Sequence, residues 1–236
     1  FNTLPYQRQD FAFVSMIVKD KDFVLKRHDG TIVPYQVMNE TKETCHDIEY
    51  YNGMENFHDS GEVLEGTKFK VQFKIDTSFL PPMGYEILKV CFKEKTSTSL
   101  QGDVSVMNRG AQNKYLSVVI EEDGTLTVTN KLTGETYHHL HTLLEKGDDG
   151  DEYNYSPCID DQEIRINDVK PTIELVESSS IEVKYRITFD TTVPSKVVDH
   201  HRSQETKPLR IITDVSLKAH SQTVDFETTI ENHSCD

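Results

Sequence analysis

Strict alternation of apolar and polar residues is the feature of this 236-residue chain that most limits its fold. In the segment 69–75, Phe, Val, Phe and Ile alternate with Lys, Gln and Lys, so the apolar side chains share one face of an extended strand. The segments 116–120, 181–189 and 224–230 repeat the pattern. No stretch of about 12 residues has the i, i+3, i+4, i+7 apolar spacing of an amphipathic helix. The pattern predicts an all-β chain of antiparallel sheets packed face to face.

Dipeptides that favour tight turns separate the alternating segments. Asx-Gly and similar pairs readily take the positive φ values that hairpins need. Aromatic and β-branched residues, including 11 Phe and 10 Tyr, supply enough apolar surface for a packed core. We therefore expect hairpin turns at the four pairs Asp29-Gly30, Asn52-Gly53, Asp123-Gly124 and Thr133-Gly134.

A polar segment without core-forming alternation divides the chain into two parts. Residues 93–99 contain only Lys, Glu, Thr and Ser, and we interpret 95–112 as a linker or long connection. Residues 1–94 have the length and strand pattern of a small immunoglobulin-like β-sandwich. Residues 113–236 begin a second, larger β-sandwich.

The charge balance excludes whole classes of partner. The chain has 25 Lys and Arg against 40 Asp and Glu, a formal net charge of −15. Binding to nucleic acid or to an anionic membrane surface requires clustered cations, which this sequence lacks. No apolar run approaches the roughly 20 residues of a membrane-spanning helix. We expect no nucleic-acid partner and no membrane, and a neutral or cationic partner stays open.

Cysteine usage indicates the compartment. Cys45, Cys91, Cys158 and Cys235 lie far apart, without the closely paired spacing of a zinc site. Four cysteines in a chain of this length do not make a disulfide framework. We expect free thiols in a reducing compartment, and therefore a cytoplasmic protein.

An acidic run followed by two tyrosines is the most distinctive local feature. The run 147–152 lacks the ligand register of an EF-hand loop, so it is either a cation site of another kind or a solvated loop. Tyr153 and Tyr155 would share one face of an extended segment. A tyrosine ring offers an apolar face and a hydroxyl to a sugar, but the same pair also suits packing at a sandwich edge.

Other chemistry-bearing residues do not form a recognisable active site. His138, His139 and His141 offer at most a pair on one strand face, while zinc needs three or four ligands. Asp160 and Asp161 are adjacent, so on a strand they would point to opposite faces and could not flank one glycosidic bond. No GxSxG nucleophile elbow occurs. The residues alone predict no catalytic and no metal-binding residue.

Five short motifs, in consistent order along the chain, resemble glycoside hydrolase family 38, the α-mannosidase family. The most specific is 150–157, with the sequence Gly-Asp-Glu-Tyr-Asn-Tyr-Ser-Pro, which resembles bacterial members. Together the motifs span nearly the whole chain: Phe1–Arg8, Pro82–Tyr85, Asp123–Tyr137, Gly150–Pro157 and Asn232–Asp236.

The resemblance implies a fragment of an enzyme. Family members carry an N-terminal catalytic domain that binds zinc through His and Asp and supplies an Asp nucleophile, and β-domains follow it. This chain resembles the β-domains alone: a small immunoglobulin-like sandwich, then part of a galactose-mutarotase-like supersandwich truncated at its C-terminus. Zinc is implied for the full-length enzyme and not for this part. Because the chain opens on Phe1 and ends inside a motif, we expect a piece of a longer polypeptide that is inactive by itself.

One site residue follows from the resemblance. In the family, a tyrosine of the large β-domain reaches the active site and touches the bound sugar, and the matching position here is Tyr153. Its neighbours Asp151 and Asn154 are further substrate-binding candidates. The implied partners are the catalytic domain of the same polypeptide and an α-mannoside, and homo-oligomerisation stays open.

Two rival hypotheses fit the same sequence. A stand-alone carbohydrate-binding β-sandwich module would also expose tyrosines to sugars, because fold alone does not determine function. A structural or adhesion protein with tandem sandwiches would need neither. The substrate of the implied enzyme, whether a glycan mannoside, mannosylglycerate or a phosphorylated derivative, is not determined by these residues.

Overall fold

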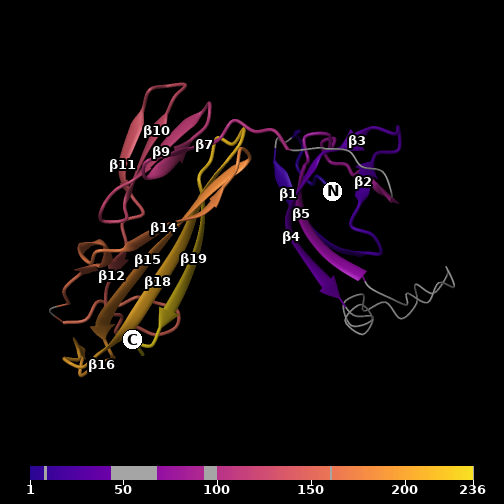
Figure 1. The fold of residues 1–236 in the computed structure, drawn as a ribbon. Helices are drawn as coiled ribbons and strands as arrows, with labels where there is room; N and C mark the ends of the chain where they lie inside the picture. Colours follow the sequence, from indigo (N-terminus) through magenta and orange to yellow (C-terminus); the bar gives the residue numbers. More distant parts are fainter. Residues whose placement is uncertain (8–9, 44–67, 93–99, 160, 236) are drawn as a thin grey trace. The chain divides into compact units, whose positions relative to one another are not determined.

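The computed structural model describes residues 1–7, 10–43, 68–92, 100–159 and 161–235 (Figure 1). Their regular structure is almost entirely β-strand, joined by one short 3-10 helix, η1 (Ile166–Asp168). The prediction of an all-β chain is confirmed. The chain divides into two compact units, Phe1–Gln101 and Gly102–Asp236.

The first unit contains two antiparallel three-stranded sheets with the orders β1-β5-β4 and β3-β2-β6. Buried side chains from both sheets meet in one core, among them Phe23 and Phe73, whose ring centroids lie 5.9 Å apart. The alternation predicted at 69–75 places Phe73 in that core. The strands are β1 (Phe11–Val18), β2 (Phe23–Lys26), β3 (Ile32–Val33), β4 (Tyr35–Glu43), β5 (Lys68–Asp76) and β6 (Lys89–Phe92).

The second unit contains a five-stranded sheet, β11-β10-β9-β8-β7, and a four-stranded sheet, β14-β15-β18-β19. Its long strands are β9 (Leu116–Ile120), β10 (Leu126–Asn130), β11 (Thr136–Leu140), β14 (Thr172–Ser178), β15 (Glu182–Pro194), β18 (Thr206–Lys218) and β19 (Asp225–Asn232). The short strands are β7 (Ser105–Met107), β8 (Gly110–Gln112), β12 (Leu144–Glu145), β13 (Ile164–Arg165), β16 (Val197–Val198) and β17 (His201–Arg202).

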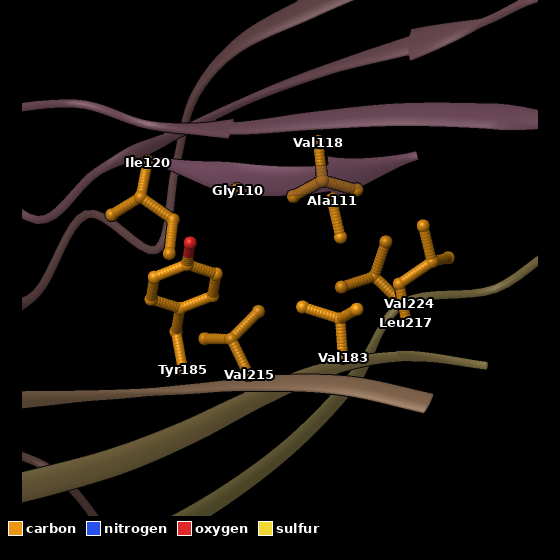
Figure 2. A pocket seen from close by; sticks show the side chains of 9 residues that line it. All are labelled: Gly110, Ala111, Val118, Ile120, Val183, Tyr185, Val215, Leu217 and Val224. Atoms are coloured by element: carbon orange, nitrogen blue, oxygen red, sulfur yellow. The ribbon is translucent and has the colours of Figure 1, made fainter. Parts of the chain in front are cut away.

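The two large sheets of the second unit pack face to face. Figure 2 shows Ala111, Val118 and Ile120 of one sheet pointing at Val183 and Tyr185 of the other. The apolar residues of the alternating segments therefore form the facing inner surfaces of the two sheets. The cavity left between them has a volume of about 10 Å³, which is at the lower limit for one water molecule and far too small for a sugar.

Two short strands lie where the sequence suggests a connection. Strands β7 and β8 fall within 95–112, and both pair into the five-stranded sheet. A three-residue strand is too short for alternation to reveal. At Gly110 a Cβ atom would lie 2.0 Å from the Val118 carbonyl oxygen, so this strand pairing requires glycine. The boundary between the two units, at Gln101 and Gly102, also lies inside this segment.

The turn predictions hold wherever the structure describes them. Gly30, Gly124 and Gly134 have φ values of 84°, 76° and 78°. The fourth pair, Asn52-Gly53, lies outside the described residues. Among the described residues, no helix has the length and apolarity needed to cross a bilayer.

Candidate functional site

The acidic run and the two tyrosines belong to one loop, residues 147–157, which we call the arm. It lies in the connection between strands β12 and β13 of the second unit. An isolated antiparallel bridge between Asp148 and Pro157 closes its base. The Asp149 backbone N–H donates to the Ser156 carbonyl, with a nitrogen–oxygen distance of 2.8 Å. The arm is thus a closed loop with its own backbone bonds.

Carboxylates of the arm accept hydrogen bonds from its backbone. Asp151 Oδ1 accepts from the N–H groups of Tyr153 and Asn154, each at 2.9 Å. Asp148 Oδ1 accepts from Gly150, at 2.8 Å, and from Ser156 across the loop, at 3.0 Å. Such bonds form turns in which an acidic side chain caps its own chain. The backbone N–H groups of Tyr153 and Asn154 lower the pKa of Asp151, which keeps the cap ionised.

One glycine allows the arm to close tightly. A Cβ atom at Gly150 would lie 1.9 Å from the Asn154 carbonyl oxygen. No side chain fits at that distance, so the turn that contains Tyr153 depends on glycine at this position.

The arm leaves its tyrosines in solvent. The Tyr153 side chain is 84% exposed and Tyr155 is 59% exposed. The interpretation of an extended segment is wrong at this point, because the Asp151 cap bends the backbone at 152–153. With so little of its surface covered, Tyr153 does not pack against the sandwich edge. An exposed aromatic ring on a constrained turn is well suited to contact a sugar.

A neighbouring hairpin holds the arm from one side. His200 lies in the turn between β16 and β17, and its Nδ1 is 2.5 Å from Asp149 Oδ2. The His200 carbonyl accepts a bond from the Ile159 N–H at 2.7 Å. The hydrogen bond and negative charge of Asp149 raise the pKa of His200. The contact therefore strengthens when the imidazole is protonated.

The remaining candidates have structural partners. The side chain of Asp161 is 8% exposed and lies 3.5 Å from the Arg202 guanidinium, while Asp160 lies outside the described residues. His141 Nδ1 donates to the Gly124 carbonyl at 3.0 Å, which leaves Nε2 to accept from the Thr213 hydroxyl at 3.0 Å. His141 is therefore a half-buried residue whose two ring nitrogens both have hydrogen-bond partners.

The other two histidines and the acidic run offer no metal centre. The ring centroids of His138 and His139 lie 6.4 Å apart, and His138 Nδ1 is 3.3 Å from the Thr127 hydroxyl. In the part of the chain that the structure describes, no three His, Cys, Asp or Glu side chains are grouped so that they could hold a metal ion.

The sequence motifs missed the residues that support the arm. His200 contacts the arm at Asp149, 51 positions away along the chain, and Arg202 contacts Glu145, just before the arm, from 57 positions away. Local patterns do not report contacts of that separation. The acidic composition of the arm gave the only signal, since an ionised carboxylate attracts basic partners.

Comparison with known proteins identifies the class. Residues 111–235 match the family model described as the glycosyl hydrolases family 38 C-terminal domain. The chain belongs to glycoside hydrolase family 38, and the resemblance carried by the five motifs is confirmed.

One relative and two solved structures are similar over most of the chain. A protein of Halalkalibacterium halodurans named "Putative mannosylglycerate hydrolase" is 25% identical over 189 residues, which cover 72% of this chain. The chain matches 21% of that relative's length.

The fold is shared with two crystal structures from Enterococcus faecalis. An α-mannosidase from strain V583 superimposes with a TM-score of 0.75 at 20% identity, covering 99% of this chain and 30% of that one. A family 38 glycosyl hydrolase gives a TM-score of 0.74 at 21% identity, covering 99% and 31%. At this identity the likeness establishes the fold.

Proposed function

We propose that this chain is the non-catalytic C-terminal β-region of a retaining α-mannosidase-type glycoside hydrolase. In that role it scaffolds a zinc-dependent catalytic domain of the same polypeptide and contributes Tyr153 to sugar binding. Two findings support the proposal. The second unit matches the family's C-terminal domain, and it exposes Tyr153 on a turn that is capped by its own carboxylate.

Tyr153 is the observation that carries the proposal. A tyrosine ring covers the C–H face of a sugar while its hydroxyl bonds to ring or exocyclic oxygens. Holding the backbone with the Asp151 cap reduces the ordering cost of that contact. Asp151 and Asn154 complete the proposed substrate-binding set, with Asp151 acting mainly through the turn that it caps.

The residues that the structure describes do not fit a zinc site. The described residues contain no group of three potential ligands, and the arm carboxylates Asp148 and Asp151 accept backbone bonds instead. In the proposed enzyme, the metal ligands would belong to the catalytic domain, as the family resemblance implies.

The parent enzyme would cleave an α-mannosidic bond with retention, in two steps through a glycosyl-enzyme intermediate. Its nucleophile and acid would come from the catalytic domain, so this chain would supply binding and support. The relative named as a mannosylglycerate hydrolase favours a small mannoside as substrate. Cys91 and the buried Cys158 form no disulfide, which favours a cytoplasmic enzyme.

Hydrolysis of an aryl α-mannoside tests whether catalysis requires the part of the polypeptide outside this chain. The longer polypeptide encoded by the gene should release the aryl group, and this 236-residue chain should not. A circular dichroism spectrum typical of β-structure would verify that the chain is folded. Measurable hydrolysis by this chain alone would overturn the scaffold role.

A stand-alone carbohydrate-binding module is the second candidate, favoured by the exposure of Tyr153 and Tyr155. Calorimetric titration of this chain with α-mannosides separates the two. Saturable binding that Tyr153→Ala removes would favour the module, whereas sugar binding only in the longer polypeptide supports the enzyme.

A further inference from the structure

Three charged side chains are buried together beside the base of the arm. The side chains of Arg202, Glu145 and Asp161 are 8%, 18% and 8% exposed. Arg202 donates from both terminal nitrogens to Glu145, with Nη1 at 2.9 Å from Oε2, and its Nη1 lies 3.5 Å from Asp161 Oδ1. Burying charged groups costs free energy unless their mutual contacts compensate for the lost hydration. A cluster of this kind therefore suggests a role other than stabilising the fold.

The cluster contacts the segments that flank the arm. Glu145 precedes the arm on β12, Asp161 follows it, and Arg202 belongs to β17. Asp161 Oδ2 accepts a hydrogen bond from the N–H of Gly147, the first residue of the arm, at 3.0 Å. One guanidinium thereby joins the chain entering the arm to the chain leaving it.

Side chains also pack closely around Gly147, at the base of the arm. A Cβ atom at Gly147 would lie 2.7 Å from Arg202 Cδ and 2.7 Å from Cys158 Sγ. Cys158 is buried and directly follows the arm. The aliphatic stem of Arg202 therefore fills the space at the base of the arm, while its fork hydrogen-bonds to Glu145 and lies 3.5 Å from the Asp161 carboxylate.

We propose that Arg202, with Glu145 and Asp161, is the positioning residue of the Tyr153 arm. The inference rests on the proposed function of Tyr153 and extends it to the residues that fix the arm's direction. A planar guanidinium fork fixes both distance and angle, which an ammonium group does not. The tyrosine is thus held in place before sugar arrives, and less binding energy is spent on ordering the loop.

Hydrogen exchange in this chain tests the positioning directly. Arg202→Lys keeps the positive charge and removes the fork. It should speed exchange of the Tyr153 and Asn154 amides by about tenfold, because the arm opens locally more often. Arg186→Lys is the matched control, since Arg186 makes a two-point contact with Asp214 at 2.7 and 2.9 Å on β15 and β18. It should leave arm exchange unchanged, and unchanged exchange in Arg202→Lys would overturn the inference.

A double-mutant cycle in the longer enzyme tests the functional consequence. For an aryl α-mannoside, Tyr153→Ala and Arg202→Lys should each lower kcat/KM by about 10-fold to 100-fold. If Arg202 acts through Tyr153, the double variant should equal Tyr153→Ala alone. Losses that multiply would overturn the positioning role and leave the role of Tyr153 intact. A Tyr153→Ala enzyme with normal kcat/KM would instead refute the proposed function, whatever hydrogen exchange shows.

A second variant covers the outcome in which Arg202→Lys does not fold. Asp161→Asn keeps the side-chain shape and an oxygen for the Gly147 N–H while it removes one of the two anions beside Arg202. It should show the same faster arm exchange and the same non-additivity with Tyr153→Ala. Normal exchange in a folded Asp161→Asn chain would contradict the inference.

Discussion

Two turns of the second unit are capped by an aspartate in the same way but have different roles. At the β9–β10 hairpin, Asp123 Oδ1 accepts bonds from the Thr125 N–H, at 3.0 Å, and from the Thr125 hydroxyl, at 2.7 Å. In the arm, Asp151 Oδ1 accepts bonds from Tyr153 and Asn154. In both, a carboxylate caps the backbone that follows it, so the caps alone do not distinguish a structural turn from a functional one.

What surrounds each turn does distinguish them. The Asp123 carbonyl accepts a bond from Asn167 at 3.0 Å, Arg165 lies 3.3 Å from its carboxylate, and Thr125 is fully buried. The Asp151 turn exposes Tyr153 to solvent. The first turn contributes to the stability of the sandwich, and the second presents a side chain at little benefit to stability.

The largest difference in stability is expected between Phe189, which lies under the Asp123 turn, and Tyr153, which lies on the Asp151 turn. Phe189 packs under Gly124 and is completely buried, so Phe189→Ala should lower the free energy of unfolding of the second unit by about 3–5 kcal/mol. Tyr153→Ala should change it by less than about 0.5 kcal/mol, because the ring is exposed. Urea unfolding followed by circular dichroism measures both. Comparable losses in the two variants would show that Tyr153 is structural.

A pair of hairpin glycines should show the next largest effect. Gly124 and Gly134 both have positive φ, but a Cβ atom at Gly124 would lie 2.6 Å from Phe189 Cζ, whereas Gly134 faces open space. Gly134→Ala should cost about 1–2 kcal/mol through backbone strain alone. Gly124→Ala should cost about 2–4 kcal/mol, because overpacking adds to the same strain. Thermal unfolding measures both losses of stability. Equal losses in Gly124→Ala and Gly134→Ala would contradict this explanation.

The Asp151 cap should affect the local order of the arm more than the stability of the second unit. Asp151→Ala removes the acceptor for Tyr153 and Asn154, so their amides should exchange with solvent several-fold faster. Asp151→Asn retains an acceptor oxygen and should exchange nearly as the parent chain does. If both variants matched the parent chain, the carboxylate would not be what orders Tyr153.

The smallest effect concerns pH. Asp149 raises the pKa of His200 above its ordinary value, so their contact stabilises the arm fully below about pH 6.5. That contribution should disappear as pH rises through the folded-state pKa of His200. Asp149→Asn should return the pKa toward about 6.5, as measured by NMR titration of the imidazole. An unchanged titration would show that the ion pair is absent in solution.

Much of the fold could be predicted from the sequence, because sheet packing repeats every second residue. The alternating segments 116–120 and 181–189 became facing strands of the sandwich, and three described turn glycines were correctly located. The short strands β7 and β8 could not be predicted, since three residues show no period.

The arm was located from sequence, but its geometry was not. Tyr153, Asp151 and Asn154 form one turn, whose bend required knowing where the Asp151 side chain bonds. Contacts from Arg202 and His200 depend on tertiary structure, and no local pattern records which distant cation meets which acidic residue. The role of Tyr153 in sugar binding remains a proposal drawn from family resemblance and supported by its exposure.

The most direct measurement is kcat/KM of the proposed full-length enzyme on an aryl α-mannoside after Tyr153→Ala. Tyr137→Ala is the matched control, because Tyr137 is another exposed tyrosine of the same unit, on β11. If Tyr153 touches the sugar, its loss should lower kcat/KM by about 10-fold to 100-fold, and loss of Tyr137 should change it by less than about twofold. Equal activity of the Tyr153→Ala and Tyr137→Ala enzymes would contradict the proposal.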